Sequence, residues 1–291
     1  MSSYNYCKLC SSNTFERLGK IRTNQTILAN KILECSVCSF VFLNDDSHIS
    51  STHYKESMMY ESKQTLEDSR IETKVDDFRR YSMLKSEITG KNILEVGSGN
   101  GGFLKLSKDV AKTVHGIEPE IRHRNVFLIE ELNINSFDYY INNKIEFDTI
   151  FSFHVIEHVS DPFAFLMQLL ALLKVNGKVY IETPNSNDAL IKLYNSEAFQ
   201  EFTYWDNHLV LFNNKSFEYM CSKVSNITYK SIPVQRYGIA NHLYWLSNRK
   251  PGGHKYWSFL ENESINSQYQ DKLSDLLMND TLFYEIIKTA K

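Results

Sequence analysis

The sequence predicts an α/β fold with a mostly parallel sheet, and two observations support that prediction. From residue 91 to about residue 183, short apolar runs alternate with segments of helical periodicity. The apolar runs are continuous, as is typical of strands covered on both faces. The chain has 291 residues, of which 42% are hydrophobic, so it is long and apolar enough for one such domain with modest additions.

The expected elements alternate along the chain. A first helix is predicted over residues 66–88, where apolar residues recur at helical spacing. Strands are then expected at NILEV, TVHGIE, FDTIFSF and GKVYIET, with helices over GGFLKLSKDV and over residues 163–173. Residues 215–223 predict a further helix, and residues 227–234 and 281–290 predict two final strands.

An insertion separates those final strands and covers residues 238–279. We expect it to form a cap over the substrate, with one amphipathic helix whose apolar face holds Ile265, Tyr269, Leu273 and Leu276. Aromatic rings stack on planar groups and basic side chains meet phosphates, so the candidate substrate contacts are His242, Tyr244, Arg249 and His254. A surface cap held together by ordinary aromatic packing is the alternative.

A glycine-rich turn is the clearest functional signal. The segment from Ile93 to Gly102, ILEVGSGNGG, leads from a strand into a helix, and its glycines let the backbone pass close to a ligand. The next strand ends at Glu118, where dinucleotide-binding folds place a carboxylate on ribose hydroxyls. The spacing G-x-G-x-G-G departs from the dinucleotide fingerprint, and Glu95 before the first glycine is unusual for that class.

The turn resembles motif I of the class I S-adenosylmethionine (SAM)-dependent methyltransferases. Residues 147–162 and 176–185 are similar to the fourth-strand motif and the fifth strand of that superfamily, so the resemblance covers most of residues 75–235. It implies a Rossmann-like, seven-stranded mixed sheet with an antiparallel last strand, and SAM as cofactor. A nucleotide-binding α/β domain of another kind is the alternative. The implied cofactor contacts are Glu95, Gly97, Gly99, Gly101, Glu118, Asp138, Phe153 and His154.

Four of the five cysteines form two Cys-x-x-Cys pairs, Cys7 with Cys10 and Cys35 with Cys38. Thiolates at this spacing can surround one tetrahedral metal ion, and their softness favours structural Zn²⁺ over an iron–sulfur cluster; unmetallated cysteines are a further alternative. A similar module precedes the methyltransferase domain of sugar C-methyltransferases. We therefore expect a zinc-binding module over residues 1–65 and a methyltransferase domain over residues 66–291.

Methyl transfer to a hydroxyl requires a group that removes a proton. His208 is the first candidate, because its segment resembles the one in which related sugar methyltransferases place a catalytic histidine. His154 is the second, since it ends the fourth strand. A hydrogen-bonded core histidine is the alternative for each. His154-x-x-Glu157-His158 also matches the inverzincin peptidase motif, but a strand leads into it. A catalytic Mg²⁺ on Glu157 and His158 is left open.

These features predict an O-methyltransferase acting on a nucleotide-linked sugar or related surface-polysaccharide precursor (capsule or lipopolysaccharide), with a phosphoramidate or phosphate oxygen as a variant acceptor. The net charge of −3 argues against a nucleic-acid partner. An RNA methyltransferase, or a SAM-binding module without catalysis, is the alternative. The first residues lack a signal-peptide pattern, and the longest apolar run, residues 163–173, is too short to cross a bilayer. We therefore expect a cytoplasmic protein without membrane insertion.

Overall fold

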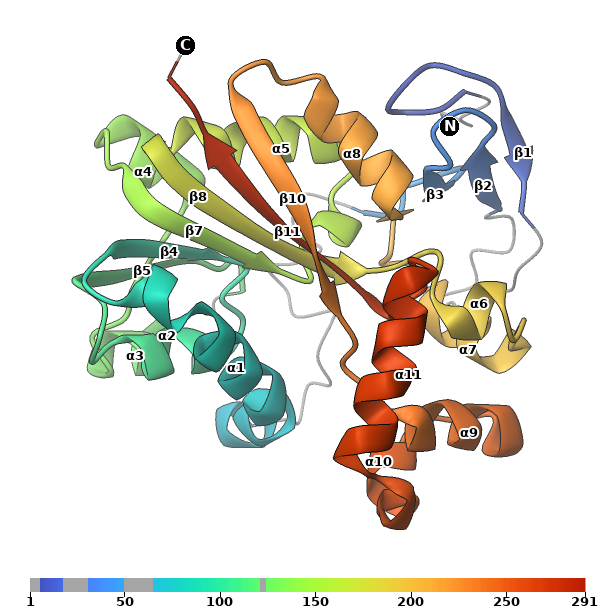
Figure 1. Cartoon of the computed structure of the whole chain (residues 1–291). Helices are drawn as coiled ribbons and strands as arrows, with labels where there is room; N and C mark the ends of the chain where they lie inside the picture. Colours follow the sequence, from blue (N-terminus) through green and yellow to red (C-terminus); the bar gives the residue numbers. More distant parts are fainter. Residues whose placement is uncertain (1–5, 18–30, 50–64, 121–123, 291) are drawn as a thin grey trace.

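A seven-stranded sheet forms the centre of the protein, in the order β10-β11-β8-β7-β4-β5-β6. The computed structural model describes residues 6–17, 31–49, 65–120 and 124–290. Helices lie on both sides of the sheet (Figure 1). The arrangement confirms the predicted Rossmann-like α/β fold with a mixed sheet.

Five strands make up the parallel part of the sheet. They are β4 (Asn92–Val96), β5 (Thr113–Ile117), β6 (Asn133–Asn135), β7 (Phe147–Phe153) and β8 (Leu173–Pro184). β4 pairs in parallel with β5 on one side and with β7 on the other. The chain therefore reverses its direction of travel across the sheet at β4, and such a switch point opens a ligand crevice at the carboxyl ends of the strands.

The last two strands complete the sheet in antiparallel fashion. β11 (Thr281–Lys288) lies between β8 and β10 (Ile227–Val234) and is antiparallel to both. Its side chains are buried from Thr281 to Ile286. The antiparallel last strand is thus confirmed.

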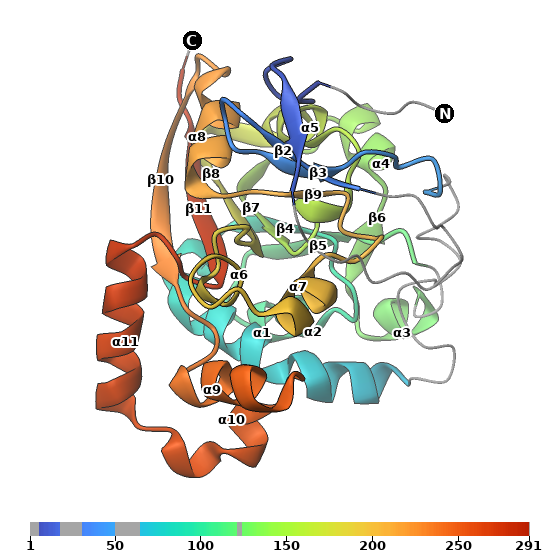
Figure 2. The same ribbon diagram turned by 90° about the vertical axis from the view of Figure 1, so that its right-hand side faces the viewer.

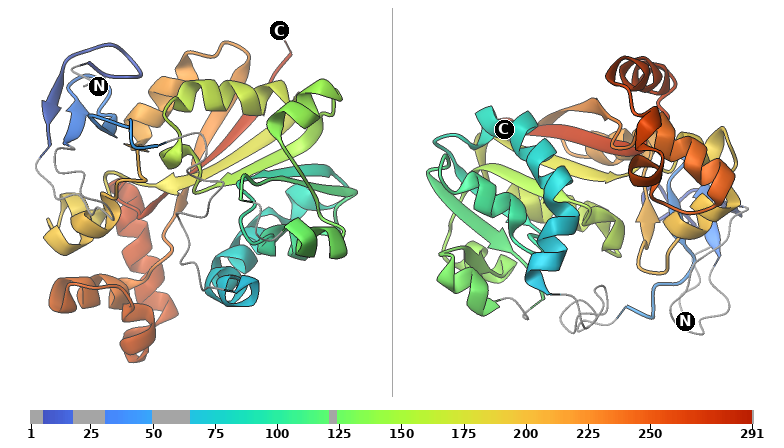
Figure 3. Two further views of the ribbon diagram at one scale, coloured as in Figure 1. Left: turned by 180° about the vertical axis from the view of Figure 1, so that it is seen from behind. Right: turned by 90° about the horizontal axis from the view of Figure 1, so that it is seen from below.

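The helices divide between the two faces of the sheet (Figure 1, and from behind and below in Figure 3). α1 (Leu66–Ile88), α2 (Gly102–Ser107) and α3 (Arg124–Ile129) contribute to one apolar cluster. α4 (Phe137–Asn142), α5 (Pro162–Ala171) and α8 (Asn214–Ser222) contribute to the other. α1 begins with a capping box, in which the Thr65 side chain accepts from the Asp68 amide and Asp68 reaches back. The expected helix over residues 66–88 is confirmed.

A second sheet joins the N-terminal residues to the larger domain. Its order is β1 (Thr14–Glu16), β2 (Ile32–Cys35), β3 (Val41–Leu43) and β9 (Val210–Leu211). β9 lies beside β3 although it comes much later in the sequence (Figure 2). The rings of Phe40 and Phe212 pack at 4.9 Å across this junction. The residues around the expected boundary at 65 include 50–64, which lie outside the described residues, so that boundary stays a prediction.

The insertion contains more helix than the sequence indicated. It consists of α9 (Ile239–Asn248), α10 (Gly253–Tyr256), a 3-10 turn η2 (Ser258–Leu260) and α11 (Glu263–Asp275). α11 is the expected amphipathic helix, but it stands at the edge of the molecule (Figure 2). Leu273 is buried, whereas Ile265 and Leu276 are 49% and 56% exposed. The rest of the protein therefore covers only part of the apolar face of this helix.

Two short helices and one turn complete the fold near the carboxyl ends of the parallel strands. α6 (Ala189–Lys192) and α7 (Glu197–Thr203) follow β8, and the 3-10 turn η1 (Ile156–His158) follows β7. Of the helices in the described part of the chain, none is long and apolar enough to cross a membrane.

Candidate cofactor and active site

The turn between β4 and α2 needs glycine for two separate reasons. Gly97 and Gly101 have φ angles of 78° and 72°, in the left-handed region that other residues rarely adopt. A Cβ on Gly97 would lie 2.2 Å from Cγ2 of Val155, and one on Gly101 would lie 3.0 Å from Cδ1 of Leu132. The turn is therefore packed tightly against the loop that follows β7.

Glu118 lies against this turn. Its Oε2 accepts a hydrogen bond from the Gly99 amide at 2.6 Å, and its Oε1 accepts one from the Glu120 amide at 2.9 Å. Burial raises the pKa of Glu118 above its ordinary value despite these two bonds. The structure thus brings together the glycine turn and the carboxylate that the sequence singled out for a cofactor ribose.

Glu95 is an unsatisfied buried acceptor beside the turn. It is 5% exposed, and its Oε2 has no hydrogen-bond partner among the described residues. Burial, together with the negative charge of Asp77, raises the pKa of Glu95 well above its ordinary value. Leaving a buried carboxylate oxygen unpaired is costly. A ligand with a cationic group, such as the ammonium or sulfonium of SAM, fits this position.

A buried ion-pair cluster lies between α1 and β8. Glu182 is fully buried, and its carboxylate lies 2.8 Å from Nη2 of Arg79 and 2.6 Å from Nη2 of Arg80. The Arg80 guanidinium also lies over the Phe153 ring at 4.5 Å. Burial opposes the charge of Glu182, but the arginines and His154 lower its pKa well below the ordinary value. The sequence analysis missed Glu182, whose one signal was a charged residue inside an apolar strand.

His154 connects this cluster to the next one. Its φ of 56° is left-handed, a conformation often found in functional sites when the residue is not glycine. Nδ1 lies 3.0 Å from Oε1 of Glu157, and Nε2 lies 3.2 Å from Oε1 of Glu182. Burial lowers the pKa of His154, but the two carboxylates outweigh burial and raise it. A general base must be neutral before it accepts a proton, so the raised pKa of His154 counts against that role. The role of general base stays a prediction for both His154 and His208.

Glu157, His158 and His208 form a second group of polar side chains. One ligand atom of each lies within 4.8 Å of the others. Glu157 is fully buried, and its Oε2 accepts a hydrogen bond from Oγ1 of Thr183 at 2.9 Å. Burial and the neighbouring charge of His158 lower the pKa of His208 to about 4, so its ring is neutral at pH 7. Both candidate catalytic histidines therefore adjoin Glu157.

Two further predicted cofactor contacts lie in different settings. Asp138 is exposed in the first turn of α4, after β6. Phe153 is 5% exposed, and its ring packs edge-on against Phe103 at 5.1 Å. Phe153 therefore forms part of the wall behind the turn.

The four predicted substrate residues are not gathered in one place. His242 and Tyr244 are 2% and 5% exposed and hold the cap together; Nδ1 of His242 lies 2.8 Å from the Tyr269 hydroxyl. Arg249 is exposed and lies 3.6 Å from the Glu197 carboxylate. For His242 and Tyr244, the arrangement matches the packing alternative.

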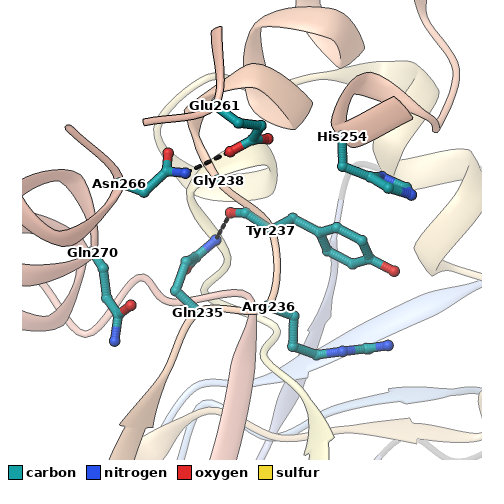
Figure 4. A pocket seen from close by; sticks show the side chains of 8 residues that line it. All are labelled: Gln235, Arg236, Tyr237, Gly238, His254, Glu261, Asn266 and Gln270. Atoms are coloured by element: carbon teal, nitrogen blue, oxygen red, sulfur yellow. Dashed lines mark hydrogen bonds between the residues drawn. The ribbon is translucent and has the colours of Figure 1, made fainter. Parts of the chain in front are cut away.

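His254 differs from the other three because it lines a pocket of about 260 Å³ (Figure 4). Arg236 and Tyr237 line the same pocket. Nη1 of Arg236 lies 3.2 Å from Nε2 of His154, and its guanidinium pairs with Asp76. The pocket is therefore adjacent to His154, through an arginine that the sequence analysis did not single out.

The four N-terminal cysteines come together as the sequence predicted. The Sγ atoms of Cys7 and Cys38 lie 3.5 Å apart, and those of Cys10 and Cys35 lie 3.4 Å apart. Zinc–sulfur bonds of about 2.3 Å in a tetrahedron require sulfur–sulfur distances of about 3.8 Å. Backbone amides approach two of the sulfurs, as thiolates require: Leu9 N to Cys7 at 3.4 Å and Val37 N to Cys35 at 3.3 Å. The donor set fits a closed four-sulfur site.

Comparison with known proteins identifies a methyltransferase. Residues 68–224 match the family described as "Methyltransferase domain". Solved structures with related folds include the plantazolicin methyltransferase BpumL with SAH (TM-score 0.49, 15% identity, covering 82% of this chain and 93% of that one). Another is phosphoethanolamine N-methyltransferase 2 of Haemonchus contortus with S-adenosyl-L-methionine (TM-score 0.47, 15% identity, covering 84% of this chain and 60% of that one).

Curated relatives include tRNA U34 carboxymethyltransferases. The protein of that name from Campylobacter lari is 32% identical over 125 residues, which are 39% of this chain and 43% of that protein. The one from Campylobacter jejuni subsp. doylei is 33% identical over 131 residues, 40% of this chain and 45% of that protein. The match therefore spans less than half of the length of these relatives.

Proposed function

We propose that this chain, a member of the family described as "Methyltransferase domain", transfers an alkyl group from a sulfonium donor such as SAM to a base of tRNA. The observation that supports the acceptor is the similarity to proteins named tRNA U34 carboxymethyltransferase. The family match over residues 68–224 includes the fold's switch point, at which ligands bind in open α/β sheets. The match covers less than half of the length of each relative, so the proposed tRNA acceptor is supported by the similarity of that part alone.

Two predictions from the sequence are corrected here. The sugar or surface-polysaccharide acceptor was wrong, and so was the exclusion of a nucleic-acid partner, because the curated relatives are named for tRNA. The first error came from the resemblance of the cysteine module and of the His208 segment to those of sugar methyltransferases, because neither feature determines the acceptor. The second came from the net charge of −3, a sum over the chain that does not describe the charge around one site.

The cofactor position in this proposal follows the glycine turn. In this proposal the Glu118 carboxylate accepts hydrogen bonds from the ribose hydroxyls, and the turn of residues 97–101 approaches the nucleoside through its glycines, which have no Cβ atoms in the way. Glu95 would pair with the cationic end of the donor. SAM supplies the electrophilic carbon, and these residues hold and orient it. The roles of Asp138 and Phe153 stay predictions.

The transferred group is either methyl or carboxymethyl, and one observation favours the second. A carboxymethyl sulfonium carries an additional carboxylate near the sulfur, which needs a cation in a buried site. Nη1 of Arg79 is buried and has no hydrogen-bond partner in the described part of the chain. This nitrogen belongs to the guanidinium that pairs with Glu182, and the Glu182 carboxylate also contacts His154. A methyl donor would leave that nitrogen unsatisfied.

For the N-terminal residues we propose a structural zinc module over residues 1–65, followed by the methyltransferase domain over residues 66–291. A four-sulfur site has no open coordination position, so its role is to stabilise. The pairing of β3 with β9 links the module to the domain. Zinc binding at the cysteines would therefore support the segment that follows α7.

The test is a transfer assay with unmodified tRNA. The full chain is incubated with tRNA and either SAM or its carboxymethyl-sulfonium analogue, and the tRNA is digested to nucleosides for mass spectrometry. We expect one nucleoside to gain a methylene or a carboxymethylene unit, and Glu118→Ala to abolish the gain. The competitive analogue sinefungin serves as blank. Donor binding measured by calorimetry, without transfer to any RNA, would contradict the tRNA acceptor.

A further inference from the structure

We propose that Glu157, His158 and His208 bind a divalent transition-metal cation beside the cofactor turn. The first two residues lie in η1, directly after β7, and His208 lies in the segment between α7 and β9. One nitrogen or oxygen atom from each lies within 4.8 Å of the others. This site is separate from the cysteine cluster and independent of which acceptor the enzyme uses.

The backbone holds both imidazole rings in an orientation suited to a metal. Nδ1 of His158 lies 2.7 Å from the Asn207 carbonyl oxygen, and Nδ1 of His208 lies 2.7 Å from the Thr203 carbonyl oxygen. A carbonyl only accepts, so Nδ1 carries the proton in each ring and Nε2 carries the lone pair. Metal-binding histidines are oriented by the same kind of bond.

The carboxylate is held in a matching way. Glu157 has no exposed surface, its Oε2 accepts from the Thr183 hydroxyl at 2.9 Å, and its Oε1 lies 3.0 Å from Nδ1 of His154. Ligating carboxylates are commonly supported by hydrogen bonds from neighbouring side chains. A buried carboxylate facing two oriented imidazoles is therefore an assembled set of donors.

The chemistry of the donors indicates the class of ion. Mg²⁺ and Ca²⁺ prefer all-oxygen ligands, whereas two imidazoles and one carboxylate suit Zn²⁺, Fe²⁺ or Mn²⁺. Bonds of about 2.1 Å place tetrahedral ligands about 3.4 Å apart, so a small closing of the three side chains is sufficient. The sequence analysis kept Mg²⁺ on Glu157 and His158 as an alternative. Because His208 adds a second imidazole to these two ligands, we expect a softer ion than Mg²⁺ at this site.

The position of the site suggests what the ion does. Val155 lies one residue after His154 and packs against Gly97, so the loop that carries Glu157 touches the cofactor turn. Three protein ligands leave coordination positions open, as in catalytic sites. An acceptor oxygen bound there would be held close to the donor, and His208 would act as a metal ligand instead of a general base.

The experiment counts ions on the intact, zinc-loaded protein. Dialysis against a weak chelator such as citrate removes the weaker ion, and atomic spectroscopy checks that the cysteine-bound zinc stays. Mn²⁺ is then titrated and followed by electron paramagnetic resonance, since thiolate sites favour Zn²⁺ over Mn²⁺. We expect one Mn²⁺ to bind per chain, and Zn²⁺ to displace it. Donor binding by calorimetry on each sample reports whether the domain is folded.

The variants separate a metal site from a polar core. His208→Ala and Glu157→Gln should weaken Mn²⁺ binding by at least about 100-fold, because changes to supporting groups alone cost about 10–100-fold. Thr183→Val keeps all three ligands and should weaken binding by about tenfold. Glu263→Gln, at an exposed carboxylate in the first turn of α11, should leave Mn²⁺ binding unchanged.

Two results would overturn the proposal. One is wild-type protein that binds donor but takes up neither Mn²⁺ nor Zn²⁺ beyond the cysteine site. The other is a folded His208→Ala or Thr183→Val variant, each binding donor normally, whose Mn²⁺ affinity equals that of the wild type. Either result would leave the tRNA transfer assay unaffected, so the two proposals fail separately.

Discussion

Replacing Gly97 with alanine tests the contact between the cofactor turn and the loop after β7. The new Cβ would lie 2.2 Å from Cγ2 of Val155, far inside van der Waals contact. The alanine at position 97 would also have to adopt the left-handed φ of 78° that Gly97 has. Both effects act on the folded protein, and they can be separated by choosing suitable partner variants.

The expected cost follows from two contributions. A left-handed backbone costs a residue with a Cβ about 1–2 kcal/mol. Crowding in a packed region costs about 1–3 kcal/mol more, because Val155 must shift or leave its rotamer. We therefore expect Gly97→Ala to lower the free energy of unfolding by about 2–5 kcal/mol, a large share of the 5–15 kcal/mol typical of a domain. Donor affinity should fall as well, since the turn amides are displaced.

Two further variants isolate the contributions in urea denaturation. Gly90→Ala has a φ of 71° with nothing within 4 Å of its Cβ, so it should cost the backbone contribution alone. In the double variant with Val155→Ala the nearest remaining atom is Cβ at 3.6 Å, so the crowding contribution should disappear. If Gly97→Ala costs no more than Gly90→Ala, the close packing between turn and loop is refuted.

Three other changes have definite expected outcomes. Glu182→Gln removes the charge that Arg79 and Arg80 share. It should lower the free energy of unfolding, measured by urea denaturation, by about 3 kcal/mol. The circular dichroism spectrum of the protein without donor should stay the same. The Arg70 hydrogen bonds lower the pKa of Glu130 to about 2 in the folded state. The stability that they contribute is therefore present above pH 4.5 and is lost as the pH falls toward 2. Arg70→Leu should flatten that part of an acid-unfolding profile. Cys35→Ser should release zinc in atomic spectroscopy and lower the melting temperature, whereas the buried Cys221→Ser on α8 should retain zinc.

Local patterns were sufficient for the elements of the main sheet. The helix over residues 66–88 and the strand over 227–234 have the predicted bounds, because periodicity and capping lie within the segments themselves. β9 was missed because its two residues have no pattern of their own and become a strand by pairing with β3. α11 has an apolar stripe, but a stripe does not reveal which neighbour, if any, covers it.

The candidate site divides in the same way. The glycine turn and Glu118 were predictable, because their chemistry depends on spacing within one strand–turn–helix–strand unit. The pairing of Arg80 with Glu182 joins residues 102 positions apart, and nothing near either one indicates the other. His242 and Tyr244 were expected at the substrate from their residue type, yet the same properties suit the interior of the cap, where they lie.

The N-terminal module and the proposed metal site are mechanically connected. β3 pairs with β9, the Leu43 amide donates to the Leu209 carbonyl at 3.0 Å, and Nε2 of His48 lies 2.7 Å from the Asp206 carbonyl oxygen. These contacts hold both flanks of His208, a loop residue that no long element positions. Because the cysteines fix the turns before β1 and between β2 and β3, a bound zinc ion would limit the motion of this small sheet. The module can therefore contribute to the site through the backbone around His208 without contacting donor or acceptor.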